Sequence, residues 1–176
     1  MKKILAVLAI LLLPLIGGFS TDMEFYVSGG CGVNAARVLE DDLFRTSWMY
    51  DVNASFLNFR FADKHTIGMP FVYKSYSETA WVESKRLDKH QDFGVGLLYK
   101  YSFNKYIELL SQATFYYKDY PVTHGSLFGM DFTMELWLMP IEYVGFKIPF
   151  TMGITKDQLD FNVGIGAVIR YTKEDI

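Results

Sequence analysis

The sequence has few of the residues that cross-link small exported proteins. It has one cysteine, Cys31, among 176 residues. A single cysteine cannot form an intramolecular disulfide, so a disulfide-bonded scaffold is excluded. A basic excess is also absent, because 17 Lys and Arg stand against 20 Asp and Glu and form no stripe or cluster. This charge pattern argues against nucleic acid as a partner.

Long hydrophobic runs are scarce too, and the only one opens the chain. In MKKILAVLAILLLPLIGGFS, two lysines precede an uncharged run that ends at Phe19, with small residues around its end. This order is typical of a secretory signal peptide. A membrane anchor is the alternative, but Pro14 interrupts a run shorter than the roughly 20 residues of a spanning helix. We interpret residues 1–20 as a cleaved signal peptide and residues 21–176 as one domain.

Aromatic residues, by contrast, are abundant, with 15 Phe, 12 Tyr and 3 Trp. They recur in segments where apolar and polar residues alternate, which is the period of a strand with two different faces. In DFGVGLLYKYSFN, one face runs from Phe93 to Phe103 without a charge, whereas the other includes Gly94, Gly96 and Lys100. Eight segments follow this pattern: 23–34, 47–61, 66–76, 92–104, 105–120, 126–140, 142–154 and 160–172.

Some stretches depart from regular alternation. The phase slips near Leu57, which predicts a bulge, and Pro70 and Pro149 predict bulges or strand ends because each removes a ladder hydrogen bond. Segment 105–120 also fits a helix. In residues 34–45 apolar residues recur at helical spacing, which predicts a short helix before the second strand.

Two closed architectures share this pattern: a soluble barrel with an apolar interior and a membrane barrel with an apolar exterior. The second face decides between them, because it combines glycines with charges of both signs. Such a face suits the narrow lumen of an eight-stranded barrel, where opposite charges neutralise one another. The hypothesis is a lumen charge network of nine residues: Glu24, Asp51, Lys74, Lys100, Glu108, Asp131, Glu135, Lys147 and Arg170.

The apolar face has no charge in any of the eight segments, and its tyrosines and Trp48 lie toward strand ends, where an interfacial aromatic belt would lie. One Lys or Arg at the bilayer midplane would cost about 2–4 kcal/mol. We therefore predict an all-β fold: an eight-stranded antiparallel up-and-down transmembrane β-barrel. A secreted soluble carrier of lipocalin type, with the same strands turned inside out, is an alternative.

The alternation and the terminal segment FNVGIGAVIRY resemble the small outer-membrane β-barrel proteins of the OmpX, OmpW and OmpA-barrel type. In that group the closing strand ends in an aromatic residue, here Tyr171, although TKEDI follows it. The resemblance implies the bacterial outer membrane, contact with its lipid and insertion by the barrel-assembly machinery. It also implies a structural or adhesin-like role, in which residues 34–46 and 77–91 contact a host or surface ligand. A narrow OmpW-like channel for small or hydrophobic molecules is the main alternative.

Candidate chemistry is sparse. His65, His90 and His124 share no ligand spacing, and Cys31 has no activating neighbour, so we expect no metal, cofactor or catalytic site. A remote alternative comes from His124 and Ser126, which point the same way in an extended chain and resemble the His-x-Ser pair of lipid A deacylases. Leu127 stands where that group has Asn, and Glu135 is the candidate for the acid that orients the histidine. Gly164 and Gly166 lie within a strand and lack the third glycine of a nucleotide fingerprint.

Overall fold

Eight strands of the chain close into a single barrel. The computed structural model describes residues 23–39, 43–61, 63–77, 90–120, 125–156 and 158–173. The interpretation of residues 1–20 as a signal peptide falls outside this part of the chain and stays a prediction. The strands are β1 (Met23–Val38), β2 (Leu43–Phe61), β3 (His65–Tyr76), β4 (His90–Asn104), β5 (Ile107–Tyr120), β6 (Gly125–Ile141), β7 (Val144–Thr155) and β8 (Gln158–Lys173).

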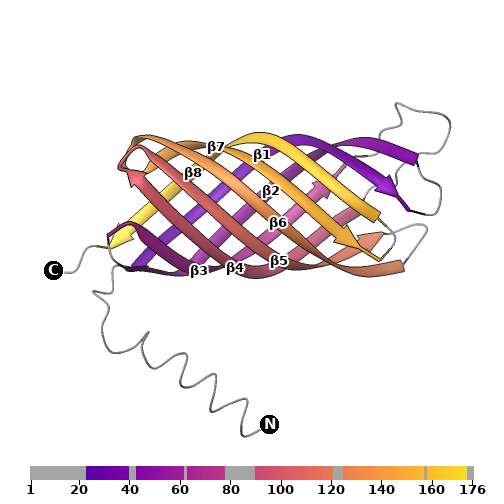
Figure 1. Cartoon of the computed structure of the whole chain (residues 1–176), viewed down its shortest axis with the longest axis horizontal. Helices are drawn as coiled ribbons and strands as arrows, with labels where there is room; N and C mark the ends of the chain where they lie inside the picture. The colour runs from indigo at the N-terminus through magenta and orange to yellow at the C-terminus, as the bar shows by residue number, and fades with distance from the viewer. Residues whose placement is uncertain are drawn as a thin grey trace, which may run out of the picture.

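Each strand pairs antiparallel with the next, and β1 pairs with β8 from Met23 opposite Lys173 to Val38 opposite Gln158. The topology is therefore up-and-down, and the sheet has no free edge (Figure 1). Short turns join β2 to β3, β4 to β5 and β6 to β7 at the end where β1 begins and β8 finishes, which we name the turn end. The other four connections lie at the opposite end, which we name the loop end. The predicted barrel is confirmed.

Alternation of side chains explains why these segments form strands. In β7 the burial pattern alternates without a break from Val144 to Thr155, and Gly145 and Lys147 face inward while Phe146 and Ile148 face outward. Segment 105–120, which also fitted a helix, forms the turn after β4 and then strand β5. Its carbonyls and amides pair with β4 and β6, so the barrel ladder satisfies them.

The helix predicted in residues 34–45 is wrong. Strand β1 continues to Val38 and β2 begins at Leu43, and the two pair as a hairpin from Asn34 opposite Ser47 to Val38 opposite Leu43. The apolar spacing coincides with a helical period by chance, because Ala36 is fully buried in the lumen as strand alternation requires. The second predicted loop, 77–91, is also shorter, since β4 begins at His90.

The predicted irregularities are partly present. The register shifts between Ser55 and Leu57 of β2, opposite Pro70, so a bulge lies beside this proline. A bulge or strand end at Pro149 was wrong, because Pro149 lies within β7 opposite Glu135. The β7–β8 ladder keeps its register there but has no pair at Pro149, which is how the missing N–H is tolerated. No helix among the described residues has the length and apolar character needed to cross a membrane.

Candidate functional site

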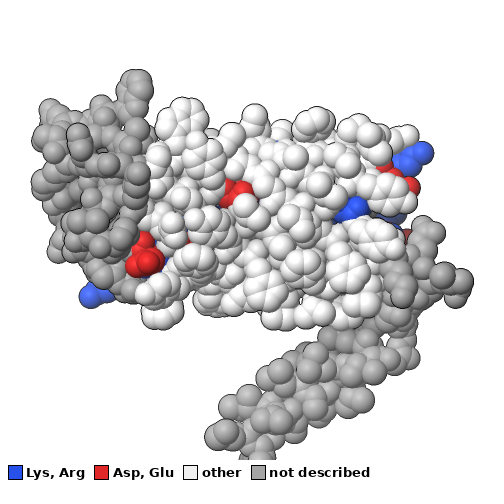
Figure 2. All heavy atoms as spheres, turned by 180° about the vertical axis from the view of Figure 1, so that it is seen from behind, with Lys and Arg blue, Asp and Glu red and all other residues white. Residues whose placement is uncertain are grey.

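The outer wall of the barrel is apolar and exposed. Leu97 is 70% exposed, Phe128 78% and Ile165 67%. Lys, Arg, Asp and Glu show mainly toward the two ends of the barrel in Figure 2, and the wall between them is largely uncharged. An exposed apolar surface of this extent is far larger than a soluble protein tolerates. The inside-out alternative, a soluble lipocalin-type carrier, is therefore wrong.

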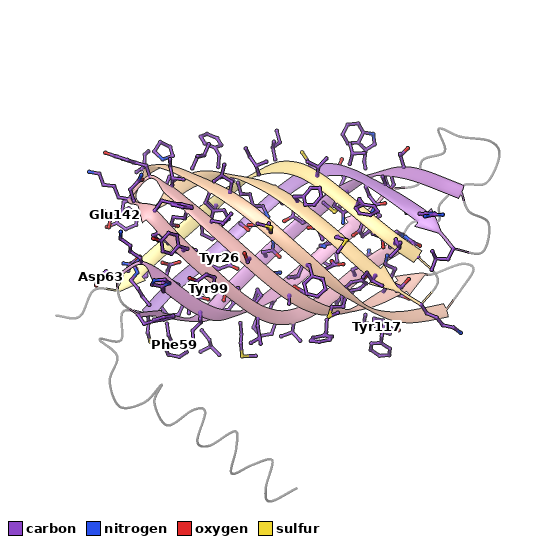
Figure 3. The ribbon with its side chains drawn as sticks, viewed as in Figure 1. Tyr26, Phe59, Asp63, Tyr99, Tyr117 and Glu142 are labelled. Carbon is purple, nitrogen blue, oxygen red and sulfur yellow. The ribbon has the colours of Figure 1, made fainter. Side chains whose placement is uncertain are left out.

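Aromatic side chains form a girdle at each end of this wall. At the loop end, Tyr73 packs against Phe93 with ring centroids 5.1 Å apart, and Tyr117 packs against Phe128 at 5.6 Å. At the turn end, Nδ1 of His65 and the Tyr99 hydroxyl form a hydrogen bond of 2.7 Å, and the His65 ring stacks on Phe61. Tyr99 and Phe59 lie toward one end of the barrel in Figure 3 and Tyr117 toward the other. Such belts mark the two interfaces of a bilayer.

One feature of the outer wall was predicted incorrectly. Asp119 is exposed and continues the outward series of β5 two residues beyond Tyr117, so the outward face is not free of charge along its whole length. Arg37, on the outward series of β1, is half-buried near the same end. Both residues lie at or beyond the loop-end girdle, where a charge can reach water and costs little.

The lumen contains the charges. All nine residues of the hypothesised charge network are buried, with exposures from 0 to 6%. They fall into three groups along the barrel, and four further charged residues join them.

The turn-end network consists of Arg60, Glu24, Lys100, Glu108 and Arg170. Lys100 Nζ lies 2.5 Å from Glu24 Oε1 and 3.2 Å from Glu108 Oε2, so it bridges two carboxylates. Arg60 extends the chain by pairing with Glu24 at 3.1 Å, and Arg170 extends it by pairing with Glu108 at 2.5 Å. Arg170 also donates to the Glu142 carbonyl at the β6–β7 turn. Charges alternate along this chain, so each carboxylate lies between two cations.

The middle network centres on Lys147. Its ammonium pairs with Asp51 and lies 3.4 Å from Glu135 Oε1. The indole of Trp137 donates to the second oxygen of Glu135 at 2.7 Å. Lys147 reaches this position by crossing Gly166, where an added Cβ would lie 2.9 Å from Lys147 Cε. The same Cβ would lie 2.3 Å from the Gly29 carbonyl oxygen, so the β1 backbone requires glycine here and the lysine chain uses the space that it leaves.

The loop-end network consists of Lys74, Asp131, Lys118, Asp92 and Asp160. Lys74 pairs with Asp131. Lys118 lies 2.9 Å from Asp160 and 4.0 Å from Asp92. Asp160 also accepts from Asn34 at 3.3 Å. The three acids exceed the two lysines here by one charge.

Apolar side chains fill the lumen between the turn-end and middle networks. We name this cluster the apolar plug, and its members are Tyr26, Leu98, Leu110, Trp137, Met139 and Val168. Trp137 is fully buried and meets Tyr26 edge to face at 5.0 Å. Tyr26 lies within the barrel in Figure 3. An eight-stranded barrel has an interior about wide enough for side chains, and here they fill it.

A cavity of about 560 Å³ opens at the turn end below the apolar plug. Arg60, Glu108 and Arg170 of the turn-end network line it, and Met139 of the apolar plug lines it as well. Asp63 and Glu142, from two of the turns, lie together at this end of the barrel in Figure 3.

The residues considered for chemistry are dispersed. His65 is on the outer wall, whereas His90 is buried in the lumen and stacks on Tyr76 at 4.1 Å. Both are the first residues of their strands, β3 and β4. Cys31 is exposed on the outer wall. His124 and the side chain of Ser126 fall outside the described residues, so the deacylase hypothesis stays a prediction.

Four lumen charges were missed from the sequence: Arg60, Asp92, Lys118 and Asp160. Three of them were detectable from alternation. Asp92 and Asp160 continue the inward phase of the glycines that follow them, and Lys118 continues the inward phase of Thr114. Arg60 was obscured because the bulge after Ser55 reverses the phase of β2.

A closed eight-stranded barrel, an apolar wall between two aromatic girdles and a charged lumen together define a transmembrane β-barrel of the outer-membrane class. The fold is thus that of an outer-membrane β-barrel, and its wall is suited to contact with lipid. No protein-family model matches the sequence, and no curated protein matches it.

Solved structures share the fold at low sequence identity. Neisserial surface protein A (NspA) has a TM-score of 0.60 at 11% identity, over 84% of this chain and 97% of NspA. Ail, the attachment invasion locus protein of Yersinia pestis, has a TM-score of 0.57 at 12% identity, over 85% of this chain and 99% of Ail. A second Ail structure, in complex with the heparin analogue sucrose octasulfate, has a TM-score of 0.55 at 15% identity, over 85% of this chain and 100% of that one. These likenesses support the fold.

Proposed function

We propose that the protein is a non-catalytic outer-membrane anchor that presents its loop-end connections to a surface ligand. The observation that carries this proposal is the filled lumen. Three charge networks and the apolar plug occupy the interior, so the barrel serves as a rigid support more readily than as a passage. The narrow OmpW-like channel is correspondingly less favoured.

The loop end supplies the surface for contact. The connections at residues 39–42, 77–89, 121–124 and 156–157 all leave the barrel on this side. The longest, SETAWVESKRLDK at 77–89, includes Trp81 and Arg86, and Trp and Arg are enriched among the residues that dominate binding energy at interfaces. Connections carried by a rigid scaffold are the usual location of binding residues.

The class of ligand proposed is a polyanionic glycan. In the longest connection, residues 85–89 have three cations, Lys85, Arg86 and Lys89, and one acid, Asp88, so this short stretch has a net charge of +2 although the whole connection has as many acids as cations. Guanidinium and ammonium groups pair with sulfate and carboxylate groups through charge-assisted hydrogen bonds. Ail, which shares the fold, has been solved with a heparin analogue, a ligand of the same chemical class.

Heparin oligosaccharide binding to the protein in lipid nanodiscs tests the proposal. Replacing Lys85, Arg86 and Lys89 together by Gln is expected to weaken binding roughly tenfold or more, and raising the salt concentration should weaken wild-type binding. The matched control is the Glu78→Gln, Glu83→Gln variant, which removes acids from the same segment and should bind equally well or more tightly. Equal affinity of the wild type and the triple variant would contradict the proposal.

The absence of catalysis is tested separately. Lipid A extracted from cells that express the wild type should have the same mass spectrum as lipid A from cells expressing a His124→Ala, Ser126→Ala variant. A deacylated species found only with the wild type would overturn the non-catalytic assignment and support the deacylase alternative.

A further inference from the structure

The cavity at the turn end has the size and the lining of a ligand site. Its volume of about 560 Å³ lies within the range of small-molecule pockets, roughly 300–1,000 Å³. Met139 lines it and belongs to the apolar plug, so the cavity meets packed side chains toward the barrel centre. Tyr106, in the β4–β5 turn, lies at its mouth. The cavity is therefore a blind pocket, partly apolar, that opens at the turn end.

Charge in this pocket is not balanced. The turn-end network has three cations, Arg60, Lys100 and Arg170, and two carboxylates, Glu24 and Glu108, which leaves one positive charge in excess. At the rim the charges cancel, because Lys64 and Lys105 are matched by Asp63 and Glu142. Excess charge inside a barrel wall surrounded by lipid is costly unless a counter-ion approaches it.

Arg60 is the cation to which a counter-ion would bind. Its side chain is 23% exposed, whereas Lys100 and Arg170 are 1% and 6% exposed. Among the described residues it forms its ion pair through Nη2 with Glu24, which Lys100 also neutralises. Arg170 is held by Glu108 and by the Glu142 carbonyl. A guanidinium has five donors, so Arg60 has capacity to bind a further oxyanion.

We propose that the turn-end pocket binds an amphiphilic monoanion, with an oxyanion head at Arg60 and a short apolar chain against Met139. The head supplies the missing negative charge, and the chain covers the apolar surface of Met139 and Tyr106. A water-soluble carboxylate and a membrane-derived fatty acid share this chemistry. This site is independent of the loop-end ligand, because it lies at the opposite end of the barrel.

Methionine methyl NMR of the full barrel in lipid nanodiscs provides the test, with hexanoate as the probe and hexanol as its neutral match. Hexanoate should shift the Met139 methyl signal with saturation, whereas the signals of Met130 and Met134, on β6 outside the cavity, should not move. Hexanol should produce a much smaller shift, because it lacks the charge. In a second experiment, oleate is supplied in the nanodisc. Tighter binding of hexanoate would indicate a ligand from the aqueous phase, and tighter binding of oleate would indicate a ligand from the membrane.

Variants distinguish a specific site from partition into the barrel mouth. Arg60→Gln should weaken hexanoate binding roughly tenfold or more, the loss expected for one charge-assisted hydrogen bond. Thr172→Trp, which fills the pocket and leaves every charge in place, should abolish binding. Lys156→Gln, at the loop end, should leave it unchanged. Heat-modifiable gel mobility verifies that each variant is folded.

The proposal is overturned if neither hexanoate nor oleate shifts the Met139 signal, if hexanol binds as tightly as hexanoate, or if folded Arg60→Gln keeps wild-type affinity. Binding that survives in folded Thr172→Trp would likewise overturn it, because the ligand would then lie elsewhere.

Discussion

At the scale of single residues, Lys147 shows how charges are tolerated inside a barrel surrounded by lipid. One ammonium neutralises Asp51 and part of Glu135, and Trp137 donates to the remaining oxygen of Glu135. Gly166 leaves space for the lysine chain. Each of these residues depends on the others, because a buried charge without its partner is far more costly than the pair is stabilising.

Replacing Lys147 by Met is therefore expected to reduce the free energy of unfolding by about 3–5 kcal/mol, since two buried carboxylates lose their cation. Urea titration of the protein in lipid vesicles measures the loss. The triple variant Asp51→Asn, Glu135→Gln, Lys147→Met removes all three charges and should recover much of the stability. If the single and triple variants are equally unstable, the cost comes from packing and the ion pairs have no large role.

Glycines that lie close to the backbone of an adjacent strand show a second constraint at this scale. A Cβ at Gly96 would lie 2.1 Å from the Ala113 carbonyl oxygen, and one at Gly164 would lie 2.6 Å from that of Cys31. The obstructing atoms are backbone and cannot rotate away. These positions need glycine because the strands of a small barrel coil tightly around a filled interior.

At the scale of elements, each strand has one face suited to lipid and one suited to the lumen. Strand β4 is a clear case, with Leu97 at its centre exposed on the wall and Lys100 buried in the lumen three residues later. Whether a charge is favourable or costly thus depends on which face of the strand it is on, lumen or lipid, and on how deep in the bilayer it lies. Asp119, on the wall of β5 beyond Tyr117, shows that depth matters as much as parity.

Two arginine substitutions separate depth from parity. Leu97→Arg should lower the free energy of unfolding in lipid vesicles by about 2–4 kcal/mol, because the charge enters the middle of the bilayer. Asp119→Arg, on the same outward face near the loop end, should change it by about 0–1 kcal/mol. Urea titration again provides the measurement. Similar losses at the two positions would contradict the placement of the girdles.

The strands themselves were predictable from the sequence, and some of their boundaries were not. Period-two alternation requires only neighbouring residues, so it located all eight strands and the bulge near Leu57. The hairpin from Asn34 to Ser47 was missed because its extension depends on pairing between β1 and β2, which local spacing cannot show. Pro149 was misjudged for the same reason. It pairs with β6 and lacks a partner only on the β8 side, and local sequence cannot show which side of a strand is unpaired.

The partners inside the lumen were not predictable either. Alternation assigns Glu24 and Lys100 to the inside, but the ion pair between them joins β1 to β4 across the barrel and depends on strand tilt and register. Likewise, the turn-end pocket combines Arg60 with Arg170 and with residues of three turns, and nothing in their sequence spacing brings them together.

At the scale of the whole molecule, the lumen is arranged in layers along the barrel axis. The turn-end network has an excess of one positive charge, the middle network one negative and the loop-end network one negative. The apolar plug separates the first of these from the second. An ion crossing the barrel would meet opposite potentials at its two ends and packed apolar side chains between them. The turn-end pocket is consequently isolated from the loop end.

This arrangement predicts that the wild-type protein gives no conductance steps in planar lipid bilayers. Removing the two rings of the apolar plug, with Tyr26→Ala and Trp137→Ala, should open its narrowest packing and allow discrete steps, because the flanking networks are polar and can be hydrated. The matched control is Phe146→Ala with Phe150→Ala, which removes two rings from the outer wall and should remain silent. Steps in the wild type would favour the channel alternative over the anchor. If the plug variant is folded but gives no conductance, the charge networks must close the lumen instead. Neutralising Lys147, Asp51 and Glu135 in the plug variant should then open it.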